Sequence, residues 1–190
     1  MPAENEIKVR LADLAAFEQR LASAGFQLKT PRTHEVNTLY DFPGHPLRGR
    51  GELLRLRRYG DQWTLTHKGP GNPGARHKSR VETETRVADG QATERILLAL
   101  GLEPVFRYEK FRSEWADSTG HVVLDHTPIG DFAEIEGPPD WLDRTASRLG
   151  ISQDGYLTSS YAELFADWKR RSGSGATEMT FAATGAKENR

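Results

Sequence analysis

Charged and apolar residues alternate strictly in several short segments, and this alternation constrains the fold more than any other feature of the sequence. In residues 4–10, ENEIKVR, the charged side chains fall on one face of a strand, and Ile7 and Val9 fall on the other. If the apolar face packs against the rest of the protein, the charged face must line an enclosed, polar interior. We therefore expect a sheet that turns its charged face inward.

The same alternation recurs along the chain, for example where Arg55 and Arg57 alternate with Leu54 and Leu56. The positions on the charged face comprise nine cations and eight carboxylates: Lys8, Arg10, Arg55, Arg57, Lys68, Arg80, Arg86, Lys110 and Arg112, with Glu4, Glu6, Glu82, Glu84, Glu114, Asp125, Glu134 and Glu136. The alternative is an ordinary half-solvated sheet whose charged faces point to water. Solubility alone does not require that cations and carboxylates form separate i, i+2 pairs, which favours a functional interior.

Composition sets broader limits on the protein. The chain has 190 residues, 36% of them hydrophobic and 28% charged, which indicates a soluble domain large enough to bury a core. The net charge of −1 does not indicate a nucleic-acid partner bound through overall basicity. The sequence contains no cysteine, so a metal would bind to oxygen or imidazole. No apolar targeting or membrane-spanning segment occurs, so we expect a cytoplasmic protein without a membrane partner.

The patterns predict an α+β fold. Eight strands are expected at 4–10, 35–41, 51–58, 62–68, 79–87, 105–115, 120–127 and 130–137. Four helices are expected at about 11–24, at 91–100, from Pro138 to Gly150, and around Tyr161–Trp168. Their apolar stripes require a partner, and the outward apolar side chains of the strands provide it. We expect one domain over residues 1–170 and a disordered tail over 171–190, where Ser, Gly, Ala and Thr lack periodicity.

An enclosed interior with paired cations and paired carboxylates suits a polyphosphate. Several linked anionic groups require several guanidinium or ammonium partners. The carboxylate pairs Glu4/Glu6, Glu82/Glu84 and Glu134/Glu136 would repel one another unless cations or a hard metal such as Mg²⁺ or Mn²⁺ lay between them. The alternative is a structural network of salt bridges.

Seven motifs carry a resemblance to a known family. They are Glu4-x-Glu6-x-Lys8, Leu54-Arg55-Leu56-Arg57, the segment from Leu65 to Pro70, Arg80-Val81-Glu82-Thr83-Glu84, Lys110-Phe111-Arg112, Leu124-Asp125, and the segment from Gly130 to Glu136. In this order they resemble the motifs of the CYTH family, the triphosphate tunnel metalloenzymes. Tyr108-x-Lys110-x-Arg112 and the segment from Ser159 to Leu164 are most similar to its class IV adenylate cyclase branch. The resemblance implies a closed eight-stranded antiparallel tunnel with a polar lumen and helices packed outside.

The resemblance also implies roles for the charged residues. The expected phosphate-binding residues are Lys8, Arg55, Arg57, Lys68, Arg80, Lys110 and Arg112. The expected metal-binding residues are Glu4, Glu6, Glu82, Glu84, Asp125, Glu134 and Glu136, and the metal would be Mg²⁺ or Mn²⁺. Glu82, Glu84 and Lys8 are the expected catalytic residues. Arg10, Arg86 and Glu114 lie on the same face but match the motifs less closely.

Three functions follow from this resemblance. The favoured one is metal-dependent hydrolysis of inorganic triphosphate, ATP or another nucleoside triphosphate. Only Met1-Pro2-Ala3 precede Glu4, whereas the cyclases resemble one another in a longer segment there, so conversion of ATP to cyclic AMP and pyrophosphate is the first alternative. A non-catalytic binder of polyphosphate or of RNA 5′-triphosphate ends is the second, and the many carboxylates argue against it. A homodimer is left open.

Overall fold

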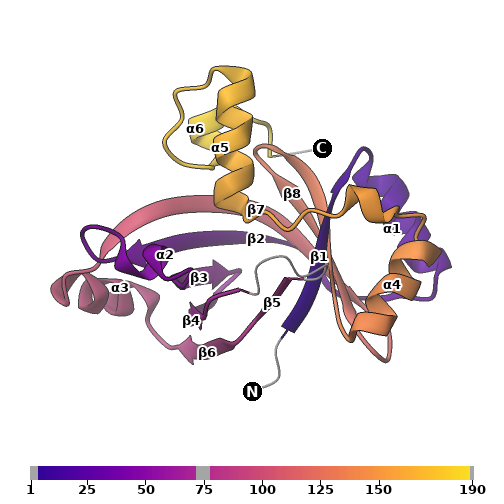
Figure 1. Cartoon of the computed structure of the whole chain (residues 1–190), viewed down its shortest axis with the longest axis horizontal. Helices are drawn as coiled ribbons and strands as arrows, with labels where there is room; N and C mark the ends of the chain where they lie inside the picture. The colour runs from indigo at the N-terminus through magenta and orange to yellow at the C-terminus, as the bar shows by residue number, and fades with distance from the viewer. Residues whose placement is uncertain (1–3, 72–77, 189–190) are drawn as a thin grey trace.

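The protein is built on one strongly curved antiparallel β-sheet (Figure 1). The computed structural model describes residues 4–71 and 78–188, without the side chains of Glu4, Lys78 and Ser79. The strands in these ranges are β1 (Glu4–Leu11), β2 (Gln27–Asp41), β3 (Leu53–Tyr59), β4 (Gln62–Lys68), β5 (Lys78–Arg80), β6 (Glu82–Val87), β7 (Glu103–Ala116), β8 (His121–Thr127) and β9 (Gly130–Glu136). Every pair of neighbouring strands is antiparallel, as the sequence predicts.

The sheet is not closed by hydrogen bonds. Its strand order is β5-β1-β9-β8-β7-β2-β3-β4-β6. The end strands β5 and β6 are consecutive in the sequence, and β5 pairs with β1 while β6 pairs with β4. Across residues 4–71 and 78–188 no ladder joins β5 to β6. The expected closed eight-stranded barrel is therefore corrected to an open sheet of nine strands.

The extra strand arises from an interruption at Val81. The segment 79–87 was expected to be one strand, but Val81 lies between the part that pairs with β1 and the part that pairs with β4. Its carbonyl oxygen accepts a hydrogen bond from the Gly69 N–H at 2.9 Å. Because this one segment contacts both sides of the sheet, it holds β1 and β4 in a fixed relation across the gap.

The largest difference in strand boundaries concerns β2. It begins at Gln27 rather than at residue 35, and it pairs with β7 from Gln27 to Asp41. The register shifts between Leu28 and Thr30 and again between Thr30 and Thr33. Residues 27–32 are exposed or half-buried and mostly polar, so no apolar alternation marks this part of the strand.

Both faces of the central strands are buried. On β1, Ile7 and Val9 are 2% and 4% exposed on the outward face, and Lys8 is 3% exposed on the inward face. Lys110 of β7 and Asp125 of β8 are buried on the same inward face. The charged face therefore points into the protein, as the alternation predicts, and the alternative of a solvated outer face is wrong for these strands.

Helices pack on both faces of the sheet. They are α1 (Leu14–Ser23), α2 (Pro46–Gly49), α3 (Gly90–Ala99), α4 (Pro139–Arg148), the 3-10 helix η1 (Gln153–Gly155), α5 (Tyr161–Ser172) and α6 (Phe181–Thr184). Phe17 of α1 and Leu142 of α4 pack with Ile7 and Ile135 in one apolar cluster. The helix α3 packs through Leu97 in a second cluster, also on the outward face. The helix α5 packs in a third cluster with Tyr108 and Phe132, which share the inward strand face of Lys110 and Glu134, so the expectation that the helices pack outside the sheet is wrong for α5. Four helices lie close to their predicted positions, whereas α2, η1 and α6 were not predicted.

Local signals set the ends of these helices. The Asp13 side chain accepts a hydrogen bond from the Ala16 N–H at 2.9 Å and begins α1, and Gly25 follows its end with φ +81°. Ser160 and Glu163 form a reciprocal capping box at the start of α5. Across the described residues, no helix is long and apolar enough to cross a membrane.

The segment after Arg171 differs from the predicted disordered tail. The helix α5 continues to Ser172, and the chain then returns to the sheet, where Met179 forms an isolated bridge with Tyr108. Met179 and Phe181 are 0% and 2% exposed. The Phe181 N–H also donates to Glu109 Oε1 at 2.7 Å. A few anchoring side chains therefore order a segment whose composition shows no periodicity.

Replacing Phe181 with Ala tests whether this segment stabilises the domain. Its ring packs against Phe111 and His126, with centroids 5.6 and 5.4 Å away. We expect Phe181→Ala to lower the free energy of unfolding by about 3 kcal/mol, whereas Ala182→Ser at the exposed neighbour should change it by less than about 0.5 kcal/mol. Urea unfolding followed by circular dichroism measures both, and equal stabilities would contradict the packing.

Candidate active site

A network of ion pairs occupies the inward face where β1, β2, β7, β8 and β9 meet. Arg112 binds Asp125 through two hydrogen bonds, Nε to Oδ1 and Nη2 to Oδ2, both 2.7 Å long. Lys110 Nζ lies 2.9 Å from Asp125 Oδ2 and 3.5 Å from Glu35 Oε1. Glu35 and Asp125 are fully buried. We call the set Lys8, Glu35, Lys110, Arg112, Asp125, Glu134 and Tyr161 the deep cluster.

Glu134 connects this network to β1. Its Oε1 lies 3.2 Å from Lys8 Nζ, and its Oε2 accepts from Arg112 Nη2 at 2.5 Å. Lys8 and Glu134 are cross-strand neighbours of β1 and β9, so their closeness follows directly from the register. Three cations and three carboxylates in the deep cluster neutralise one another.

The electrostatic surroundings keep the deep carboxylates ionised. Burial raises the pKa of Glu35, but the positive charges of Lys110 and Arg112 outweigh it and lower that pKa to about 2. Burial likewise opposes ionisation of Glu134, and Lys8, Lys110 and Arg112 hold its pKa well below the usual range. Glu35 and Glu134 therefore stay ionised at neutral pH.

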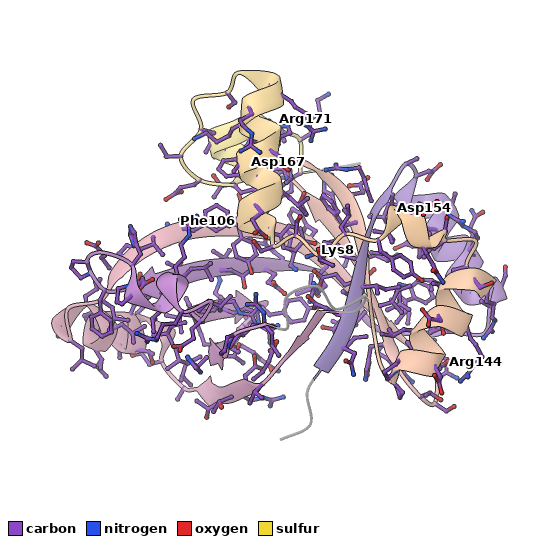
Figure 2. The ribbon with its side chains drawn as sticks, in the orientation of Figure 1. Lys8, Phe106, Arg144, Asp154, Asp167 and Arg171 are labelled. Carbon is purple, nitrogen blue, oxygen red and sulfur yellow. The ribbon has the colours of Figure 1, made fainter. Side chains whose placement is uncertain are left out.

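Tyr161 brings the helix α5 into the deep cluster. Its hydroxyl donates to Asp125 Oδ2 at 2.7 Å, and Lys8 Nζ and Lys110 Nζ lie 4.4 and 4.8 Å from its ring centroid. Burial and the charges of Asp125 and Glu134 raise the pKa of Tyr161 well above its usual value, so the phenol stays protonated. Figure 2 shows Lys8 beside the N-terminal end of α5.

A second group of charges lies on β3, β4 and β6, nearer to solvent. Arg55 Nη2 and Arg57 Nη2 lie 3.6 and 3.3 Å from oxygens of Glu84. Lys68 is paired with Glu82, its cross-strand neighbour. The Glu84 side chain is 39% exposed. We call Arg55, Arg57, Lys68, Glu82 and Glu84 the rim cluster.

Two threonines hold the rim cluster in place. Thr66 donates to Glu84 Oε2 at 2.6 Å, and Arg57 Nε donates to the Thr64 hydroxyl at 3.1 Å. Thr64 and Thr66 alternate with Trp63 and Leu65 and lie on the inward face, as the sequence pattern indicates. The polar side of β4 thus supports the charges rather than reaching water.

The rim and deep clusters belong to one electrostatic unit. The charges of Arg57 and Arg55 contribute to the low pKa of Glu35, after burial and the larger effects of Lys110 and Arg112. One oxygen of Glu35, Oε2, is buried without a hydrogen-bond partner, and so is Arg55 Nε. Buried unpartnered groups are uncommon in native proteins and often mark functional sites.

The predicted metal-binding carboxylates offer the oxygen ligands that a hard divalent cation prefers. Their donors are all oxygens, and Glu6 and Glu136 face each other as cross-strand partners of β1 and β9. A cation between two carboxylates relieves their mutual repulsion. Among the described side chains, no three acidic or histidine residues are grouped so as to hold a metal. Asp125 and Glu134 instead bind lysine and arginine, so the predicted metal set does not converge as a whole.

Several predicted residues lie apart from both clusters. Arg10 is exposed and donates to the Ile129 carbonyl at 3.1 Å, and Arg86 is exposed on β6. Glu114 accepts from the Thr30 hydroxyl at 2.9 Å. Arg80 is half-buried, and its Nε has no hydrogen-bond partner. It pairs in register with Glu4 of β1, but the structure does not describe the Glu4 side chain.

Sequence reasoning missed Glu35, Asn37 and Tyr161. Glu35 and Asn37 share one face of the predicted strand 35–41, and a hydrogen bond of 2.9 Å joins their side chains. That parity was a usable signal, because Glu35 lies opposite Lys110 in the register. Tyr161 gave no such signal, since it also belongs to an apolar helical stripe.

Comparisons with known proteins identify the family. The CYTH domain model matches residues 2–140. Adenylate cyclase CyaB from Aeromonas hydrophila is 31% identical over 175 residues, which cover 85% of this chain and 87% of that protein. The chain belongs to the CYTH family, as the order of its charged motifs predicts.

Solved structures show the same fold. A candidate adenylate cyclase from Vibrio parahaemolyticus superposes with a TM-score of 0.76 at 22% identity, covering 87% of this chain and 98% of that one. A candidate adenylyl cyclase from Hippeastrum, described as having a dominant triphosphatase activity, superposes with a TM-score of 0.64 at 18% identity, covering 88% and 96%. Because the sequence identities are below 25%, the structural similarity shows the fold alone.

The low pKa of Glu35 predicts a specific acid response. A carboxyl whose pKa falls from 4.5 to about 2 on folding contributes stability above pH 4.5 that is lost as the pH falls toward 2, and a shift of that size corresponds to roughly 3 kcal/mol. Glu35→Gln should lower the free energy of unfolding at pH 7 by about 3 kcal/mol. It should also make the free energy of unfolding at pH 3 more similar to that at pH 7 than it is in the parent chain. Urea unfolding at both pH values measures this.

The matched control is Glu103→Gln, which changes an exposed glutamate on β7. It should leave both the stability and its pH dependence as in the parent chain. A Glu35→Gln variant with an unchanged acid response would show that Glu35 is not held ionised by Lys110 and Arg112.

Proposed function

We propose that this chain is a divalent-metal-dependent enzyme that hydrolyses a linear triphosphate on the inward face of its sheet. The substrate would be inorganic triphosphate, ATP or another nucleoside triphosphate. The observation that carries the proposal is the buried row of cations interleaved with carboxylates. Burying an ion costs several kcal/mol even after relaxation, so six cations held on one inward face point to a function that uses them.

The rim cluster is the proposed first contact for phosphate. Its three cations, Arg55, Arg57 and Lys68, exceed its two carboxylates by one positive charge. Glu84 is the most exposed side chain among these ion pairs, and its carboxylate pairs with the guanidinium groups of Arg55 and Arg57. Phosphate oxygens would replace it, because arginine binds phosphate through the same paired hydrogen bonds as carboxylate. Glu82 and Glu84 are then released toward a metal or a nucleophilic water.

The deep cluster is proposed to fix the far end of the substrate. Lys8 lies at its edge and also donates to the Ser159 carbonyl at 3.2 Å. Lys110 and Arg112 are held by Glu35 and Asp125, so their charges stay in place without reorganisation. Pre-positioned charge of this kind stabilises the developing negative charge of phosphoryl transfer. The segment 78–87 would close the tunnel around the bound triphosphate.

Glu6 and Glu136, with Glu4, are the proposed metal-binding residues. Their carboxylate oxygens suit Mg²⁺ or Mn²⁺, and phosphate oxygens would complete the coordination. A metal bound there supplies charge neutralisation to the phosphates. Water attack, oriented by Glu82 or Glu84, would release orthophosphate.

Cyclisation of ATP is the second candidate. The observation that favours it is the 31% identity to a protein named adenylate cyclase CyaB. In this reaction the ribose 3′-hydroxyl attacks the α-phosphate and pyrophosphate leaves, while the same cations hold the phosphates. Hydrolysis and cyclisation therefore differ in the nucleophile, not in the charged face.

Product analysis distinguishes these reactions. The purified protein is incubated separately with inorganic triphosphate and with ATP, each with Mg²⁺ or Mn²⁺, and ³¹P NMR identifies the products. We expect orthophosphate to be released only when metal is present. Cyclic AMP with pyrophosphate would establish the cyclase instead, and unchanged substrate would leave the non-catalytic binder.

Glu6→Gln tests the metal assignment. The amide keeps the size of the side chain and removes one negative charge. Because loss of a group that merely supports a metal ligand costs about 10–100-fold, we expect metal-dependent turnover to fall about 100-fold or more, with the free energy of unfolding nearly unchanged. Glu103→Gln serves again as the control, and unchanged turnover of Glu6→Gln would refute the assignment.

A further inference from the structure

A pocket of about 470 Å³ lies beside α5 and contains neither cluster of the candidate active site. Its lining residues are Arg10, Leu157, Leu164, Asp167, Arg170 and Arg171. Leu164, Asp167 and Arg171 lie three and four residues apart and so share one face of the helix. Figure 2 shows Asp167 and Arg171 on the part of α5 that is farther from Lys8 of β1.

Positive charge in this pocket exceeds negative charge. Asp167 is paired with Arg170, which leaves Arg10 and Arg171. Asp131 attracts Arg10, yet burial and the charge of Arg171 together lower the pKa of Arg10. Within the described part of the chain, Arg171 has no ion pair. The guanidinium groups of Arg10 and Arg171 thus line a common space.

The rest of the pocket is apolar. Leu164 is buried in the cluster under α5, and Leu157 packs against the same cluster. Leu157 is held in place because its N–H donates to the Lys8 carbonyl at 2.7 Å. A small ligand here meets guanidinium groups on one side and aliphatic side chains on the other.

One aromatic ring, that of Phe132, lies between Arg10 of the pocket and Tyr161 of the deep cluster. The guanidinium of Arg10 lies over the Phe132 ring at 4.5 Å, and Phe132 contacts Tyr161 edge to face at 5.6 Å. Tyr161 in turn donates to Asp125. The lining of the pocket therefore shares no residue with the deep or the rim cluster, and Phe132 lies between Arg10 and Tyr161.

We propose that this pocket is a second anion site, which binds a phosphate monoester bearing an apolar or aromatic group, with the phosphate on Arg10 and Arg171 and the organic group over Leu157 and Leu164. Free phosphate and inorganic triphosphate lack the organic group that contacts Leu157 and Leu164, so they should bind this pocket more weakly than the monoester. A mononucleotide has the size and the mixed chemistry that the pocket offers. This site is independent of the triphosphate reaction proposed above.

Calorimetric titration with AMP, without metal, tests the proposal. The wild-type chain should bind AMP and should not bind adenosine, which lacks the phosphate. Arg171→Gln should weaken AMP binding at least about tenfold, because hydrogen bonds between charged groups are the strong ones. Arg144→Gln, at an exposed position on α4 in another part of the molecule, should bind AMP like the wild type (Figure 2).

Competition separates this pocket from the active site. Saturating inorganic triphosphate should not displace AMP from the wild type, and Arg171→Gln should hydrolyse triphosphate at the wild-type rate. Equal AMP affinity in Arg171→Gln, displacement by triphosphate, or absence of AMP binding would each overturn the proposal. Failure of triphosphate hydrolysis in the wild type would refute the proposed function and leave the second site standing.

Discussion

Neutralisation of buried charge on the inward face is the constraint on which the rest of the structure depends. Arg112 contacts carboxylates of β8 and β9, and Lys110 contacts β2 and β8, so the consecutive strands β7, β8 and β9 meet the distant strand β2 at one set of ions. Removing one partner of such a pair leaves an uncompensated ion and typically costs about 3–5 kcal/mol. A one-residue slip of any of these strands would turn its charges outward and its apolar residues inward.

The two clusters differ in a way that suggests a division of labour. The deep cluster is neutral and largely buried, so it holds the register and provides fixed charge. The rim cluster has an excess cation and includes Glu84, which is 39% exposed. Rearrangement costs least where side chains are solvated, because water replaces the lost partner. The proposed exchange of carboxylate for phosphate would therefore take place at the rim, next to the fixed charges of the deep cluster.

Local alternation predicted much of this from sequence, because each strand carries its own two-residue period. It placed Lys8, Lys110 and Asp125 on the inward face and the helices α1, α3 and α4 on the outward face, but it did not place α5 on the inward face. It failed where the cause is not local. Glu35 acquires its role from the register of β2 against Lys110 of β7, and segment 171–188 is ordered by distant contacts of Met179 and Phe181. The break at Val81 likewise reflects a change of pairing partner between β1 and β4.

The candidate active site extends beyond the part of the chain that matches the family model. That match ends at residue 140, whereas the Tyr161 hydroxyl completes the hydrogen bonding of Asp125 and its ring lies beside Lys8 and Lys110. The capping box of Ser160 and Glu163 fixes the start of α5 and thereby the position of Tyr161. Packing of α5 against the returning C-terminal segment then holds the helix on the sheet. The helix α5, outside the family match, thus contributes to the candidate site, because its Tyr161 hydroxyl is a hydrogen-bond donor to Asp125.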